Sequence, residues 1–77
     1  MRIVLHNQIY RHYKGKLYKI ITFARSTDNP SEIHVIYQAQ YTEPKYGQNC
    51  IWSRKLHEFN DDVIINGIKQ RRFTLQK

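Results

Sequence analysis

The chain has 77 residues, which is enough for one small domain and too few for two hydrophobic cores. Aromatic residues make up 13% of it, with only three glycines and two prolines, so its composition is not that of a disordered chain. Thirteen lysines and arginines against six acids give a net charge of +7, which favours an anionic partner without saying which anion.

The cysteine count and the length of the apolar runs indicate where in the cell the protein is located. Cys50 is the only cysteine, so no internal disulfide can form and nothing suggests secretion. The apolar run Ile3-Val4-Leu5 is far too short for a signal-peptide core or a membrane span. We therefore expect a cytoplasmic protein with no membrane partner.

The charge is unevenly placed along the chain. Residues 1–25 carry six cations and no acid, and residues 26–49 carry one cation and three acids. Residues 50–77 carry six cations and three acids. The N-terminal third is therefore the most basic part.

The first predicted elements form a hairpin. Residues 10–14, YRHYK, read as a short strand, and Gly15 can take the positive φ of the turn that follows. Residues 17–25 are rich in β-branched and aromatic types and predict a longer strand. Residues 1–8 are expected to be a short edge strand or a loose arm.

The clearest strand pattern follows a loop at residues 26–32, where Asp, Asn, Pro and Ser favour turns. Residues 33–41 alternate with period two, which predicts a half-buried strand. One face of that strand would carry Ile33, Val35, Tyr37, Ala39 and Tyr41. Residues 42–49 are expected to be a second loop, and residues 50–54 a fourth strand.

The last predicted elements are a helical turn and a hairpin. Leu56 and Phe59 are three residues apart, which suits a single helical turn. Asn66-Gly67 lies between the apolar residues 63–65 and the run 68–75. A two-residue Asn-Gly loop favours the type I′ turn that closes a hairpin.

These elements predict a fold class. Five or six short antiparallel strands with no helix to cover a sheet must curl to bury one side. We expect an all-β protein, a single domain over residues 1–77 folded as a small SH3-like β-barrel. One helical turn would precede the last hairpin.

Several short blocks in the chain resemble a small bacterial family, domain-of-unknown-function family 1653. Its YRHYKG-like opening and the Leu-Tyr and Ala-Arg pairs after it are matched by Tyr10, Arg11, His12, Tyr13, Lys14, Gly15, Leu17, Tyr18, Ala24 and Arg25. Its later blocks are matched by Val35, Tyr37, Tyr41, Trp52, Arg54, Phe59, Val63, Asn66, Gly67, Arg72 and Phe73. The resemblance covers residues 10–73 and supports the fold, but the family has no established activity.

Two departures from the family pattern stand out. Lys55 occupies a position where proline is usual, so the entry to the helical turn is expected to be looser. The loop between Tyr41 and Trp52 is long, and Tyr46-Gly47 is expected to form a surface that the family lacks.

Catalytic and metal-binding patterns are scarce. The histidines His6, His12, His34 and His57 lack the spacing of a metal site, so each is expected to be satisfied or exposed. Cys50 is expected to be a buried small hydrophobe rather than a nucleophile, and Glu58, Asp61 and Asp62 to cap and turn the chain rather than act as acid and base. We expect that the protein is not an enzyme and binds neither a metal nor a cofactor.

The aromatic and basic residues leave two interpretations open. Tyr37, Tyr41 and Trp52 lie on apolar faces and are either core residues or rim residues whose rings stack on a base. The YRHYK strand places cations on both faces, which fits a solvated edge strand or a surface that grips an anion.

The function predicted from these features is a non-catalytic binding module for an anionic partner, with single-stranded nucleic acid or a nucleotide as the leading ligand. The candidate ligand-binding residues are Arg11, His12, Lys14, Lys16, Tyr37, Tyr41, Trp52 and Arg54. The alternative is a protein-interaction module that docks a partner strand or an acidic surface at the barrel edge. A third hypothesis is a nucleotide-sequestering oligomer with its site between subunits; the oligomeric state is left open.

Overall fold

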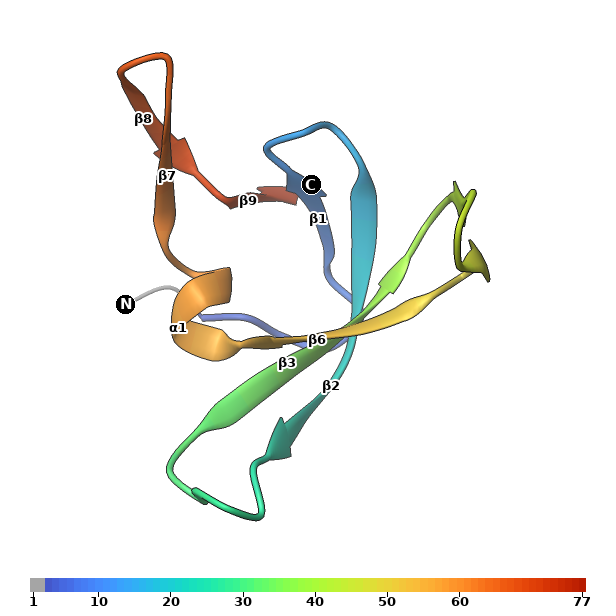
Figure 1. Cartoon of the computed structure of the whole chain (residues 1–77), viewed down its shortest axis with the longest axis vertical. Coiled ribbons are helices and arrows are strands. Elements are labelled where there is room, and N and C mark those ends of the chain that lie inside the picture. The colour runs from blue at the N-terminus through green and yellow to red at the C-terminus, as the bar shows by residue number, and fades with distance from the viewer. Residues whose placement is uncertain (1–2) are drawn as a thin grey trace.

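The computed structural model describes residues 3–77 as an all-β domain in which a five-stranded antiparallel sheet is joined by two small hairpins and one helical turn (Figure 1). Along the chain the elements are β1 (Ile9–His12), β2 (Leu17–Arg25), β3 (Ile33–Ala39), β4 (Thr42–Glu43), β5 (Gly47–Gln48), β6 (Ile51–Lys55), α1 (Leu56–Phe59), β7 (Asp62–Ile65), β8 (Ile68–Arg71) and β9 (Phe73–Gln76).

The predicted strands are confirmed with small shifts at their ends. The strand predicted at residues 17–25 is β2 without change, and β6 lies one residue later than predicted. β1 ends at His12 because the chain turns there: the Gly15 N–H donates to the His12 carbonyl over 2.7 Å, and Gly15 has a φ of 106°. β3 ends at Ala39, two residues early.

Two segments differ from their predictions because their backbones are hydrogen-bonded to other parts of the chain. The loop at residues 42–49 contains the short hairpin β4–β5, so the prediction of an unpaired loop was wrong there. Residues 3–8 form neither a strand nor a loose arm, because the Asn7 N–H donates to the Ile20 carbonyl over 2.8 Å and the Gln8 carbonyl accepts from Ile20 over 2.9 Å. Residues 1 and 2 lie outside the described part of the chain.

The strand order in the sheet is β6-β3-β2-β1-β9, so the last strand pairs with the first. The sheet is open, with β6 and β9 as its edges, and the SH3-like barrel predicted from the sequence is therefore not confirmed. A β-bulge between Ile20 and Thr22 interrupts the β2–β3 register. Bulges bend and twist a strand, which fits the sharply coiled sheet in Figure 1.

The core lies against the inner face of this sheet. The alternation predicted for β3 is confirmed, since Val35, Tyr37 and Ala39 are all buried. Phe59 and Phe73 stack in parallel, with ring centroids 4.0 Å apart and an interplanar angle of 10°. The buried residues are Tyr10, Ile20, Val35, Tyr37, Ala39, Phe59 and Phe73. Four aromatic rings therefore supply most of the buried volume.

The helical turn α1 positions Phe59 over the core. Lys55, just before it, has a φ of −58°, a value that proline also adopts. The Lys55 ammonium lies 3.3 Å from a Glu32 carboxylate oxygen. The lysine thus connects the start of α1 to the β2–β3 loop through an ion pair.

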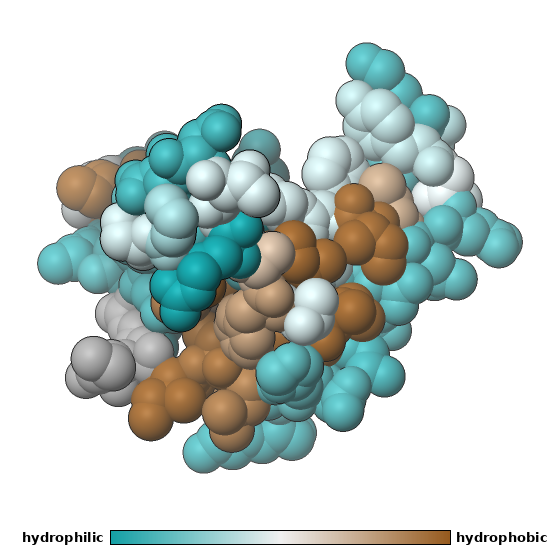
Figure 2. Space-filling view, turned by 90° about the horizontal axis from the view of Figure 1, so that it is seen from below, coloured by the Kyte–Doolittle hydropathy of each residue, from teal (hydrophilic) through white to brown (hydrophobic). Residues whose placement is uncertain are grey.

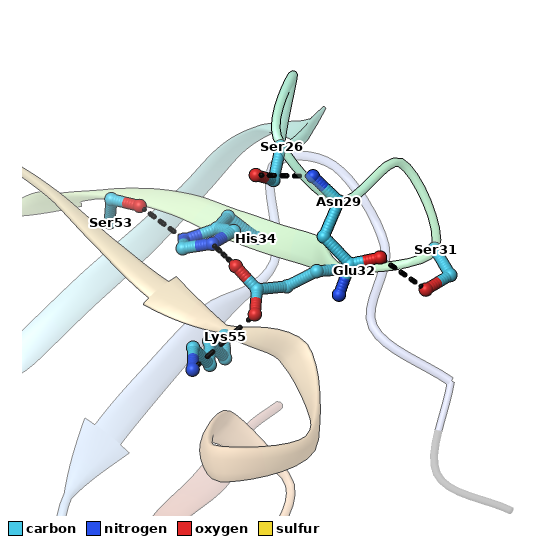
Figure 3. Close-up of polar contacts among 7 residues, drawn as sticks. All are labelled: Ser26, Asn29, Ser31, Glu32, His34, Ser53 and Lys55. Carbon is cyan, nitrogen blue, oxygen red and sulfur yellow. Dashed lines mark hydrogen bonds and ion pairs between the residues drawn. The ribbon is translucent and has the colours of Figure 1, made fainter.

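That ion pair belongs to a polar network on the outer face of the sheet (Figure 3). His34 Nε2 lies 2.8 Å from Glu32, and His34 Nδ1 lies 2.8 Å from the Ser53 hydroxyl, so both ring nitrogens have partners. The hydrogen bond from His34 is the main reason that the pKa of Glu32 is lowered. The expectation of a satisfied histidine is confirmed at His34.

The outer surface carries apolar as well as charged residues. Seen from below, hydrophobic residues gather in a band that crosses the face (Figure 2). Residues 3–77 contain no helix long and apolar enough to cross a membrane.

Candidate ligand-binding site

His12 lies at the end of β1, next to the β1–β2 turn. Its Nδ1 accepts a hydrogen bond from the Lys14 backbone N–H over 3.2 Å, so in the neutral ring the proton is on Nε2. Burial lowers the pKa of His12, and the nearby charges of Arg54, Lys14 and Arg72 lower it further. His12 is therefore held as a neutral imidazole with an Nε2–H donor.

The three cations around His12 come from three separate parts of the chain. Lys14 lies in the β1–β2 turn, Arg54 on β6, and Arg72 between β8 and β9. Arg72 donates from Nε to Asp61 over 2.7 Å, so its charge is compensated. Within residues 3–77, Lys14 and Arg54 have no carboxylate partner, and the site has an uncompensated positive charge.

Three tyrosines contact one another on the inner face of the sheet, and one of them accepts a hydrogen bond from Arg54. The hydroxyls of Tyr18 and Tyr41 lie 2.6 Å apart, and the Tyr18 ring meets Tyr37 edge to face at 5.2 Å. Arg54 donates from Nε to the Tyr37 hydroxyl over 3.3 Å. Burial and the hydrogen bond to Tyr41 raise the pKa of Tyr18, so its phenol stays neutral.

Two lysines lie over half-buried tyrosine rings next to this site. The ammonium of Lys16 is 5.1 Å from the centroid of Tyr41, and that of Lys14 is 5.8 Å from the centroid of Tyr13. A ring with a cation above it offers a flat face and a positive charge together. We name this group the aromatic–cation cluster; its members are His12, Tyr13, Lys14, Lys16, Tyr18, Tyr37, Tyr41 and Arg54.

Comparison with known proteins places the chain in a family. The sequence model described as "Protein of unknown function (DUF1653)" matches residues 8–75. The chain belongs to the DUF1653 family. A crystal structure of a DUF1653 protein from Bordetella bronchiseptica is 30% identical in sequence, with a TM-score of 0.73 over 90% of this chain and 83% of that one. A search of curated proteins finds no match.

The DUF1653 fold brings together six of the eight residues predicted to bind a ligand: His12, Lys14, Lys16, Tyr37, Tyr41 and Arg54. Tyr37 is 5% exposed, so its ring is a core residue and only its hydroxyl takes part, through Arg54. Of the two interpretations, Tyr37 is therefore a core residue, whereas the half-buried Tyr41 lies at the rim.

Two predicted residues lie elsewhere in the DUF1653 domain. Arg11 alternates with Tyr10 and His12 and faces the opposite side of β1, where its guanidinium donates to the Gly15 carbonyl over 2.8 Å. Trp52 packs on the core and meets the exposed Tyr46 edge to face at 5.4 Å. The Nε1 of Trp52 is buried and has no acceptor within residues 3–77.

Sequence reasoning missed Tyr13 and Tyr18 as members of the cluster. Tyr18 shares its face of β2 with the buried Ile20, and this parity was available as a signal. Its meeting with Tyr41 depends on the Tyr18↔Ala39 register of β2 and β3, which no local pattern specifies.

The remaining reactive side chains are engaged or isolated. Cys50 is half-buried rather than buried as predicted, because it lies just before the edge strand β6. Asp61 is held by Arg72, and the Asp61 N–H donates to the Glu58 carbonyl over 3.2 Å at the end of α1. Residues 3–77 contain no group of three or more His, Cys, Asp or Glu suited to hold a metal ion.

Proposed function

We propose that this DUF1653 protein is a non-catalytic binding module for an anionic partner, with single-stranded nucleic acid or a nucleotide as the leading ligand. The observation that carries the proposal is the surroundings of His12, whose Nδ1 accepts from the Lys14 N–H and whose pKa is lowered by burial and by the charges of Arg54, Lys14 and Arg72. Two of these cations lack a carboxylate partner in the described chain, and cations gathered from separate segments favour binding of an anion in their midst.

The aromatic rings favour a nucleic acid over a simple anion. Tyr41 is half-buried and Tyr46 is exposed, and a lysine ammonium lies over each ring at 5.1 Å and 5.5 Å. A base stacked on such a ring places its phosphate within reach of the lysine, and stacking contributes about 1–3 kcal/mol per base. Arg54 and the His12 Nε2–H would bind a further phosphate as donors.

The competing interpretation is a solvated edge, in which the lysines only keep strands from adding to the sheet. It fits Arg11, whose guanidinium folds back onto its own turn. It does not account for Arg54, which is half-buried on the inner side of β6 and donates to the buried Tyr37.

The test is a titration of a labelled single-stranded oligonucleotide and of a mononucleotide into wild type and two double variants. Lys14→Glu with Lys16→Glu reverses two cluster lysines, and Lys19→Glu with Lys69→Glu reverses two lysines outside the cluster. Each reversal changes the charge by two, so both variants fall from +7 to +3. We expect the cluster variant to lose most of its affinity while the control variant keeps most of it.

Salt dependence separates specific contacts from general attraction. Three or four phosphate contacts to a single strand predict a log–log slope of affinity against salt of about −2 to −3. We expect Arg54→Gln to reduce the magnitude of that slope by about 0.7, the value of one phosphate contact. If wild type does not bind at low salt, or if the two double variants bind alike, the solvated edge is the better account.

Two finer assignments are proposals of the same kind. The order β9-β1-β2-β3-β6, with a helical turn between β6 and β9, supports an open SH3-like barrel. The single cysteine of the sequence supports a cytoplasmic location.

A further inference from the structure

The β7–β8 hairpin is separate from the main sheet. β7 and β8 pair only with each other in the described chain, and they project away from the crossing of β2, β3 and β6 (Figure 1). All four residues of β8 are exposed, and Ile64 and Ile68 are 72% and 67% exposed. Ile68 lies beside Ile65, which is 36% exposed, and an exposed apolar pair on a projecting hairpin marks a candidate interaction surface.

The register gives the hairpin two different faces. Ile65 pairs with Ile68 and Val63 with Gln70, so these residues share one face, which is mainly apolar. The other face carries Ile64 beside Lys69 and Asp62 beside Arg71, and an Asp62 carboxylate oxygen lies 3.7 Å from the Lys69 ammonium. Arg71 has no carboxylate partner within residues 3–77.

The outer edge of β8 offers backbone hydrogen bonds. Ile65 and Ile68 flank a two-residue turn and form its hydrogen-bonded pair, so the next positions alternate. The N–H and C=O groups of Lys69 and Arg71 consequently point away from β7. No strand within residues 3–77 covers them.

We propose that the outer edge of β8 accepts an extended peptide strand from another protein, in which acidic residues alternate with apolar ones. An added strand would place every second side chain beside Lys69 and Arg71 and the others beside Ile68 and Gln70. Acidic residues would pair with the cations at the positions beside Lys69 and Arg71, and an apolar residue would cover Ile68.

Charge also argues against a second copy of this chain as the occupant. Pairing β8 with β8 would bring the Lys69 and Arg71 side chains of two copies together, and each copy carries a net charge of +7. Cations on an edge strand discourage edge-to-edge aggregation and repel strands of like charge. The same cations attract an acidic strand.

The test adds three peptides with capped termini to the isotopically labelled full chain. In the first peptide Glu alternates with Val. The second has the same residues with all Glu residues first, and in the third Lys alternates with Val. With the alternating Glu peptide, we expect shifts at the Lys69 and Arg71 amides and slower exchange of both amide protons. The other two peptides should bind at least about tenfold more weakly.

A charge-swapped variant supplies the matched control. Lys69→Glu with Arg71→Glu changes only exposed side chains and is expected to reverse the preference, so that the alternating Lys peptide binds more tightly than the Glu peptide. Equal binding of the alternating Glu peptide and of the peptide with all Glu residues first would overturn the proposal. Shifts confined to His12 and Arg54, or self-association through β8 measured by sedimentation, would also overturn it.

Discussion

At the scale of single residues, Arg54 and His12 show how a site arises from the packing of distant strands. His12 would be an ordinary histidine on an isolated hairpin. In the folded protein it meets Phe73 edge to face at 5.0 Å and lies close to three cations, so its charged form is disfavoured. The side chain is thereby kept neutral as a hydrogen-bond donor.

The lowered pKa of His12 predicts that the protein loses stability on mild acidification. The unfolded chain binds this proton near its ordinary pKa of 6.5, and the folded chain only at lower pH. The stabilising contribution is therefore complete above pH 6.5 and is lost as pH falls through 6.5 toward the folded pKa.

Thermal melts of wild type and His12→Asn between about pH 7.5 and 5 check this prediction. The asparagine oxygen can still accept from the Lys14 N–H, and we expect its melting temperature to fall less with pH than that of wild type. His57→Asn, at an exposed position, should keep the wild-type slope. Parallel curves for wild type and His12→Asn would contradict the cationic environment of His12.

At the scale of elements, the β7–β8 turn follows from local chemistry. Asn66 and Gly67 have φ values of 53° and 77°, as the type I′ turn predicted from the Asn-Gly pair requires. Gly67→Val forces a β-branched residue into positive φ and is expected to cost about 1–3 kcal/mol. Asn66→Gly, which tolerates the same φ, is the control.

Chemical denaturation and amide exchange of β7 and β8 measure the effect. Because the hairpin pairs only with itself among residues 3–77, part of the loss should appear as faster exchange confined to these two strands. If the Gly67→Val variant has the same amide exchange rates and the same denaturation midpoint as the Asn66→Gly control, a strained turn is excluded.

Local signals account for the elements better than for their arrangement. Alternation in residues 33–39 and the Asn-Gly pair specify a strand and a turn within a few residues of sequence. The bulge after Ile20 and the pairing of β1 with β9 depend on how the whole sheet packs. The cluster shares this limit, because Arg54 and His12 lie on strands at different positions in the sheet and no spacing rule connects them.

At the scale of the whole molecule, stability depends on a few aromatic rings. Phe73 stacks on Phe59 and meets Tyr37 edge to face at 5.6 Å. Phe73→Ala would remove one side of this stack and leave a cavity, at an expected cost of about 3–5 kcal/mol. A domain of this size has on the order of 4–11 kcal/mol of net stability, so the variant should lose a large fraction of it and melt at a much lower temperature than wild type.

Circular dichroism melts of Phe73→Ala and Phe73→Leu measure this loss. The leucine fills part of the cavity and should retain a cooperative transition at a lower temperature. A Phe73→Ala protein that melts as wild type does would mean that β9 contributes little to the core.

The pairing of β9 with β1 has a consequence during protein synthesis. When residue 55 has left the ribosome, β1, β2, β3 and β6 are available, but the nascent chain still lacks Phe59 and Phe73, which pack beside Tyr10 and Tyr37. The apolar side of the growing sheet is fully covered only when residue 76 has emerged, because only then can β9 pair along β1 and Phe73 pack on Phe59. The chain is therefore most exposed to chaperones and proteases in the interval between the synthesis of its fourth and fifth sheet strands.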